Sequence, residues 1–258
     1  MDASHAGTPK VAEYIDALEI AGRRLAAAAA EAGPDAEVPT CPGWRIRDLL
    51  RHTSMVHLWA TDLVVQAHTT YQPGGGETSL DGEELLTHFR EGHAGLVAAL
   101  REAPESLECW TFLPTSSPLA FWARRQAHET TVHRADAESA LTAGPGAVEP
   151  SLAVDGIDEL LFGFHGRGRS RVRTAEPRIL RLRATDTGDA WTVRLSATEP
   201  PRTERDDRAA GPGDTELAGA AGRLYLVLWN RLPVDAVTLT GDEELARVWR
   251  ETSGITWS

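Results

Sequence analysis

The stretch RRQAHETTVHRAD, residues 124–136, places a glutamate and a histidine four residues apart, with a second histidine directly before the glutamate. In the zinc-protease motif two histidines lie at positions i and i+4, and the glutamate that follows the first of them acts as a base. Here His128 and His133 are five residues apart, so on a helix they point to different faces. Glu129 and His133 share a face. If a metal binds here, Glu129 is a ligand rather than a base, and further ligands must come from elsewhere in the chain.

The same helix carries a longer polar stripe. Trp122, Gln126, Glu129, His133 and Asp136 follow one another at intervals of four, three, four and three residues. Their neighbours are largely small or apolar, which favours burial, and a buried carboxylate or imidazole requires a partner because an unpaired buried charge is costly. A divalent cation would satisfy both groups. The alternatives are a buried hydrogen bond between Glu129 and His133, or exposure of both.

The first 165 residues have the spacing of a helical bundle. Apolar residues recur at intervals of three and four over 9–32 and 45–67, then from Leu85 to Leu100, and a fourth helix is predicted from near Pro118 to about residue 141. Stretches rich in proline or glycine, such as PTCPGW and QPGGGETS, separate these helices. The pattern predicts an antiparallel four-helix bundle, and an amphipathic segment at 151–164 leads out of it.

The composition changes after residue 165. A glycine- and arginine-rich linker is expected at 165–176, a β-hairpin at 178–184 and 190–196, and a loop at 199–214, which has too few apolar residues to bury. A short strand, a helix over about 218–231, and a further strand, turn and helix complete the chain. The sequence therefore predicts an α plus α+β protein with two domains, a helical bundle at 1–165 and a small α+β domain at 166–258.

Composition excludes several classes of protein. A net charge of −12 argues against a nucleic-acid partner, which requires a basic face. Neither an apolar run long enough for a membrane span nor a secretory signal is present, so we expect a cytoplasmic protein, and we expect it to be a monomer. Cys41 and Cys109 have no spacing that suggests a thiolate zinc site or a disulfide framework.

A third candidate ligand lies earlier in the chain. In the second predicted helix His52 belongs to a row with Leu49, Val56, Trp59 and Leu63, and this row should face the core. Two imidazoles and one carboxylate make the three-ligand set of a catalytic zinc site with an open fourth position, although nickel, iron or cobalt would also suit these ligands. The other histidines of this region, His57, His68, His88 and His93, are interpreted as surface or packing residues.

The sequences PTCPGWRIRDLLRH at 39–52 and RRQAHETTVHRADAE at 124–138 resemble the N-terminal domain of the mycothiol-dependent maleylpyruvate isomerase family, within the DinB-like superfamily of metal-binding four-helix bundles. DGIDELL at 155–161, GAAGRLYLVLWNRLP and TGDEEL resemble the end of that family's bundle and its C-terminal domain. The resemblance implies that His52, Glu129 and His133 bind the metal. It also implies an essential C-terminal arginine, for which we select Arg231, with Arg223 as the second choice.

The resemblance further implies mycothiol as the thiol cofactor. A thiol bound at the open position of a divalent metal, with zinc as the expected ion, would lose its proton and supply a nucleophile. Addition to an activated double bond, rotation and elimination would isomerise a small electrophilic substrate such as an unsaturated carboxylic acid, whereas addition alone would make the protein an S-transferase. Two other functions stay open, a metal-binding protein without turnover that acts as a sensor or partner-binding module, and a metal-dependent hydrolase.

Residues next to the predicted site allow two interpretations each. Asp136 either orients a ligand imidazole or forms a salt bridge with Arg134 or Arg51. Cys41 is interpreted as a packed turn residue rather than a reactive thiol, and Trp44 as packing at the start of the second helix. His128 is expected at the surface or in an interhelical contact rather than against the substrate.

Overall fold

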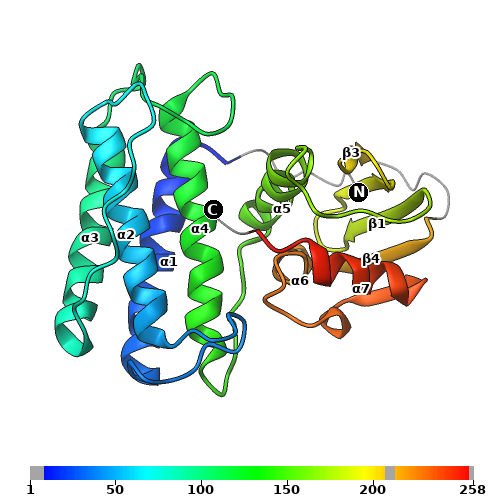
Figure 1. Cartoon of the computed structure of the whole chain (residues 1–258), viewed down its shortest axis with the longest axis horizontal. Coiled ribbons are helices and arrows are strands. Elements are labelled where there is room, and N and C mark those ends of the chain that lie inside the picture. The colour runs from blue at the N-terminus through cyan, green and yellow to red at the C-terminus, as the bar shows by residue number, and fades with distance from the viewer. Residues whose placement is uncertain (1–8, 207–212, 256–258) are drawn as a thin grey trace. The chain divides into compact units, whose positions relative to one another are not determined.

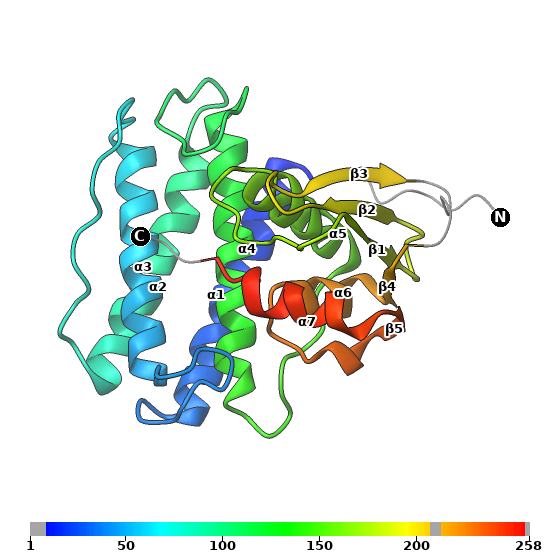
Figure 2. The same ribbon diagram turned by 45° about the vertical axis from the view of Figure 1, so that its right-hand side comes forward.

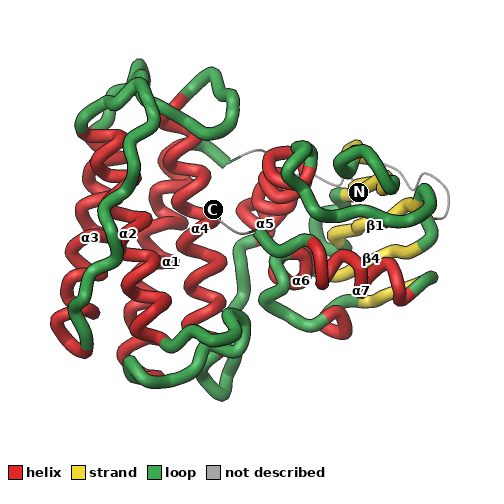
Figure 3. Tube along the Cα trace, viewed as in Figure 1, coloured by secondary structure: helices red, strands yellow, loops and turns green. Residues whose placement is uncertain are grey.

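The computed structural model describes residues 9–206 and 213–255. Contacts divide the chain into two compact units, one of residues 9–146 and one that begins at residue 147. The first unit contains helices joined by long loops, and the second combines helices with a sheet (Figure 3). This is the predicted fold class, a helical bundle followed by an α+β unit.

Four helices form the first unit: α1 Val11–Ala32, α2 Ile46–Val65, α3 Gly82–Glu102 and α4 Pro118–Ser139 (Figure 1). Each lies within a few residues of its predicted span. Helix α4 begins as the sequence indicates, because Pro118 lies in the first turn and the Ser117 hydroxyl accepts a hydrogen bond from the Ala120 N–H.

The direction of each helix follows from the loops between them. The connection 66–81 runs back along α2, so that Arg51 near the start of α2 donates to the Leu80 carbonyl just before α3 begins. Helices α2 and α3 therefore run parallel, and so do α1 and α4, where Tyr14 meets His128 and Arg24 meets Glu138. The predicted antiparallel arrangement therefore holds between these two pairs, as in the α1/α3 and α2/α4 contacts, but not within them. The sequence did not indicate that a loop returns along the bundle.

The buried face of α2 differs from the predicted one. Leu49 and Leu63 are fully buried as expected, but His52, Val56 and Trp59 are half-buried. The core face of this helix instead includes polar residues such as Thr53 and His57. Thr53 can be buried because its hydroxyl donates to the Leu49 carbonyl one turn earlier. Such locally satisfied polar side chains are invisible to an analysis of apolar periodicity.

Helix α5, Pro150–Asp158, begins the second unit and continues directly into a π-helix, η1, Glu159–His165. Both belong to the second unit because α5 packs on α6, Ala221–Leu228. The predicted domain boundary at residue 165 lies after these two elements, whereas the division between the compact units lies before them.

The sheet contains five strands in the order β3-β2-β1-β4-β5 (Figure 2). Strands β1 Arg178–Ala184 and β2 Ala190–Leu195 form the predicted hairpin, β1 and β4 Thr215–Gly219 run parallel, and β5 Thr238–Gly241 is an antiparallel edge strand. A short 3₁₀ turn, η2 Val234–Ala236, precedes β5, and helix α7, Glu243–Thr252, follows it and packs on β4.

The prediction of a loop throughout 199–214 was wrong, because β3, Arg202–Asp206, pairs with β2 at the edge of the sheet. Its sequence, RTERD, lacks apolar residues, but an edge strand needs only its backbone hydrogen bonds and can leave its side chains in solvent. Residues 207–212 of that predicted loop lie outside the described residues. No described helix combines the length and the apolarity that a membrane span requires.

Candidate metal centre

His52, Glu129 and His133 come together between α2 and α4, and one potential ligand atom from each lies within 4.8 Å of the other two. His133 Nε2 is 3.1 Å from Glu129 Oε1, and His52 Nε2 is 3.8 Å from the same oxygen. The imidazole rings of His52 and His133 stand edge to face, 5.2 Å apart between centroids. Two imidazole nitrogens and one carboxylate oxygen thus lie close enough together to share one metal ion.

Glu129 is held by a cation that sequence reasoning missed. Arg125, one turn earlier on α4, donates from Nη2 to Glu129 Oε2 at 2.7 Å, and both side chains are buried. Burial disfavours the charged carboxylate, but Arg125 and the hydrogen bonds from His133 and His52 outweigh it and hold the pKa of Glu129 well below its usual range. Glu129 is therefore ionised, with Oε2 fixed and Oε1 directed at the two histidines. The four-residue spacing of Arg125 and Glu129 was the available signal.

His133 is oriented by a second carboxylate. Its Nδ1 donates to Asp136 Oδ2 at 2.9 Å, and the other oxygen of this fully buried aspartate accepts a hydrogen bond from the Thr40 hydroxyl at 2.6 Å. Burial lowers the pKa of His133, but Asp136 and Glu129 outweigh this and raise it to about 9. The structure shows the orienting contact of Asp136 with His133, which leaves Nε2, the nitrogen that faces Glu129, as the candidate ligand atom. Thr40 gave no signal in the sequence.

His52 has a looser environment than His133. Its side chain is 16% exposed, and Nδ1 lies 3.9 Å from the carboxylate of Glu77, a half-exposed residue of the loop 66–81. Trp44 packs against the His52 ring at 5.1 Å between centroids. His52 therefore lies at the edge of the α2/α4 contact rather than in the core row where periodicity placed it. Its Nε2 faces Glu129 and its Nδ1 faces Glu77.

The ligand atoms fit a zinc ion. Bonds of about 2.0–2.1 Å in tetrahedral geometry separate neighbouring ligand atoms by roughly 3.3 Å. The observed separations of 3.1 and 3.8 Å bracket that value. Each histidine directs Nε2 inward and has a carboxylate near Nδ1, which is the usual environment of a metal-bound imidazole. The donor set consequently suits a divalent cation with one further position for an exogenous ligand.

The other residues named from the sequence include His128, Cys41 and Arg231. His128 is fully buried and packs against Tyr14 of α1, so its interhelical interpretation is right and its surface interpretation is wrong. Cys41 is a partly buried residue of the turn before α2, packed against the bundle core. Arg231 follows α6 in the second unit, where its Nη1 donates to the Trp229 carbonyl at 2.7 Å.

A second histidine cluster lies in the core of the bundle. His57 Nε2 is hydrogen-bonded to the Thr130 hydroxyl at 2.9 Å, and His93 Nε2 to the Leu18 carbonyl at 3.0 Å. Burial, with a contribution from His93, lowers the pKa of His57 to about 3. These two histidines are neutral packing residues, which agrees with their interpretation from the sequence.

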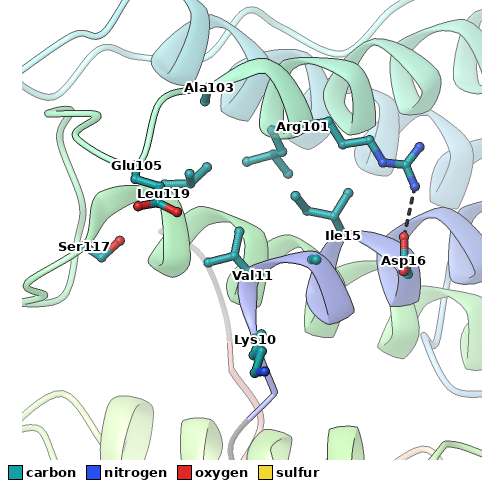
Figure 4. A pocket seen from close by; sticks show the side chains of 11 residues that line it. Lys10, Val11, Ile15, Asp16, Arg101, Ala103, Glu105, Ser117 and Leu119 are labelled. Carbon is teal, nitrogen blue, oxygen red and sulfur yellow. Dashed lines mark hydrogen bonds and ion pairs between the residues drawn. The ribbon is translucent and has the colours of Figure 1, made fainter.

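A pocket of about 690 Å³ lies at one end of the bundle and includes none of the three candidate ligands (Figure 4). Its lining includes the apolar residues Val11, Ile15 and Leu119 and the charged residues Lys10, Asp16, Arg101 and Glu105. Arg101 is already paired with Asp16 at 3.0 Å. This mixture of charges selects no class of ligand.

Two family models match the sequence. The mycothiol maleylpyruvate isomerase N-terminal domain matches residues 15–138, and the MDMPI C-terminal domain matches residues 151–247. The crystal structure of the mycothiol-dependent maleylpyruvate isomerase is similar, with a TM-score of 0.63 and 14% identity over 92% of this chain and 95% of that one. A histidine-to-alanine mutant of that enzyme has a TM-score of 0.62 with the same identity and coverage. Among curated proteins none matches the sequence.

Proposed function

The chain belongs to the mycothiol-dependent maleylpyruvate isomerase family, and on this premise we propose that it uses mycothiol and a divalent metal to isomerise, or to add the thiol to, a small electrophilic substrate. Membership of this family makes it an enzyme, a thiol-dependent isomerase. An unsaturated carboxylic acid such as maleylpyruvate is the substrate class we propose. The main support for this proposal is that the side chains of His52, Glu129 and His133 meet between helices α2 and α4.

The proposed metal ligands are His52 Nε2, Glu129 Oε1 and His133 Nε2, with zinc as the expected ion. A bound divalent cation would favour the deprotonated form of a thiol at the remaining position and so supply a nucleophile at neutral pH. The protein's part is to hold three ligand atoms in place before the metal arrives. Arg125 holds Glu129, Asp136 holds His133, and both contacts are buried, so little reorganisation is needed.

Charge balance supports this assignment. The buried charges alternate in sign along α4. The cation of Arg125 contacts the Glu129 carboxylate, which contacts His133, which in turn contacts the Asp136 carboxylate. With its pKa raised to about 9, the metal-free His133 is protonated at neutral pH. Metal binding requires a neutral imidazole and therefore displaces that proton, while Asp136 keeps Nδ1–H in place. We expect metal affinity to fall as the pH is lowered.

We propose Arg231 as the residue that binds the substrate carboxylate, with Arg223 as the second choice. A guanidinium can hold a carboxylate with two hydrogen bonds, and it can also stabilise an enolate oxygen that develops during addition to the double bond. Arg231 is partly buried next to the end of α6, whereas Arg223 is exposed on that helix. Arg231→Ala should raise KM for the substrate while leaving metal content unchanged, and Arg223→Ala serves as the matched comparison.

Two measurements test the proposed function. Metal content of the purified protein should be about one per chain, and His52→Ala and His133→Ala should lose it, whereas His88→Ala should not. Mycothiol added to the cobalt-substituted protein should produce a thiolate charge-transfer band. Unchanged metal in both ligand variants would overturn the ligand assignment, and a missing band would overturn the use of mycothiol.

We also propose that the enzyme is a cytoplasmic monomer that binds neither nucleic acid nor membrane. The net charge of −12 supports the first exclusion, since phosphate contacts need clustered cations. Sedimentation of the purified protein, alone and with DNA or anionic vesicles, should give a single species of one chain in each case.

A further inference from the structure

Gln126 lies on the same stripe of α4 as the candidate metal ligands. It is three residues before Glu129 and four after Trp122, so its side chain points to the same side of the helix. Across the α2/α4 contact, His52 faces Glu129 and Trp59 packs on Trp122 with ring centroids 5.3 Å apart. The amide of Gln126 therefore occupies the level between the proposed metal centre and the aromatic pair.

This amide is buried and incompletely hydrogen-bonded. Gln126 is 1% exposed, and its Oε1 has no hydrogen-bond partner among the described residues. Helices α2 and α4 run antiparallel here, so the α2 residues at this level are Met55 and Val56. Neither side chain carries an N–H or O–H group. No described residue of α2 donates to the Gln126 oxygen.

An unsatisfied buried acceptor is costly. Leaving such a group without a donor destabilises a fold by roughly 1–3 kcal/mol, and natural proteins keep such exceptions mainly where function needs them. Other polar residues of the stripe do have partners, since Glu129, His133 and Asp136 are all hydrogen-bonded to one another or to neighbours. Gln126 is the exception among these four, one helical turn from the ligand atoms.

The Gln126 oxygen needs a hydrogen-bond donor, and this requirement distinguishes the proposed thiol cofactor from the proposed carboxylate substrate. At neutral pH a carboxylate substrate presents acceptor oxygens, which cannot satisfy the Gln126 oxygen. A cysteine-derived thiol carries amide N–H groups close to its sulfur. In a thiol bound to the metal through its sulfur, this N–H group would lie about one helical turn from the metal centre. Gln126 is separated from the ligand Glu129 by about the same distance along α4.

We propose that Gln126 is a specificity residue for the thiol cofactor, whose amide N–H donates to the Gln126 side-chain oxygen. This inference rests on the proposed function, because it requires a thiol at the metal centre. The amide group of the thiol cofactor would then be recognised by a residue of the helical bundle.

The test compares two thiols that differ only in the donor. N-acetylcysteamine carries an amide N–H two carbons from its sulfur, and 2-mercaptoethyl acetate has an ester oxygen at that place. Each is titrated into cobalt-substituted wild-type protein, Gln126→Met and Gln66→Met, with the thiolate charge-transfer band as the readout. Gln66 is an exposed glutamine at the end of α2 and provides the matched control.

We expect wild type and Gln66→Met to bind the amide roughly three- to tenfold more tightly than the ester, the effect of one hydrogen bond. Gln126→Met should bind both thiols equally while it keeps its full metal content. Equal binding of the two thiols by wild type, a band with neither of them, or an unchanged preference in Gln126→Met would overturn the inference. A failure of mycothiol itself to give a band in wild type would instead remove the proposed function, and this inference with it.

Discussion

The helical bundle contains two pairs of histidines with similar spacing and opposite chemistry. The rings of His52 and His133 lie 5.2 Å apart between centroids, and those of His57 and His93 lie 5.6 Å apart. The first pair shares the carboxylate of Glu129, and the pKa of His133 is raised to about 9 in spite of its burial. The second pair is bound to a hydroxyl and a backbone carbonyl, and burial lowers the pKa of both its members.

The difference shows that proximity of histidines does not by itself make a metal site. Carboxylates near the first pair favour positive charge, whether this is a proton or a metal ion. The second pair has only neutral hydrogen-bond partners, so nothing outweighs the lowering of the imidazole pKa by burial. Those rings therefore stay neutral and serve as packing. Four predictions test this contrast.

The largest effect is expected for loss of a ligand. His133→Ala should lower zinc affinity by roughly two to three orders of magnitude, since one ligand contributes on the order of a quarter of the binding free energy of a structural zinc site. His57→Gln should keep stoichiometric metal. Competition with a chromogenic chelator measures both affinities, and comparable losses in the two variants would erase the distinction between the pairs.

In the second pair, His57 should make the free energy of unfolding depend on pH. Unfolded His57 is protonated below about pH 6.5, but the folded pKa is about 3, so the unfolded state binds more protons in this window and stability falls as the pH falls. By pH 4 the loss from this residue alone is on the order of 3 kcal/mol. Urea unfolding across pH 7 to 4 should show a flatter dependence in His57→Gln. A slope that matches wild type would mean that His57 is protonated in the folded protein.

Removing the orienting carboxylate should have an intermediate effect. Asp136→Asn leaves His133 without its charged partner and should lower zinc affinity roughly ten- to a hundredfold. The matched change at the second pair, Thr130→Val, removes the partner of His57 and should cost about 1 kcal/mol of stability with no change in zinc affinity. We would abandon the orienting role of Asp136 if its asparagine variant bound zinc as tightly as wild type.

The smallest effect is expected at Glu77. Its carboxylate lies 3.9 Å from His52 Nδ1 and is half-exposed, so solvent screens the interaction. Glu77→Gln should change zinc affinity by no more than about threefold. A loss as large as that of Asp136→Asn would show instead that both ligand histidines depend equally on their carboxylates.

Much of the bundle could be predicted because its signals are local. The spacing of Leu85, Phe89, Leu96 and Leu100 identifies α3, and all four are buried. Proline and glycine mark the ends of helices. The limits appeared where polar residues are buried, as at Thr53 and His57, and where a strand has no apolar residues, as in β3. In those places contacts with neighbouring elements outweigh the sequence pattern.

Within the candidate site, the sequence by itself determined the relation of Glu129 to His133, because residues four apart on one helix must share a face. It also supplied His52 as the third ligand candidate. Only the tertiary structure decided that His52 Nε2 lies 3.8 Å from Glu129, that Thr40 reaches Asp136, and that Gln126 is left without a donor. The physical reason is that helical periodicity is a property of the local backbone, whereas hydrogen-bond partners across helices depend on how loops such as 66–81 direct and rotate the elements they join.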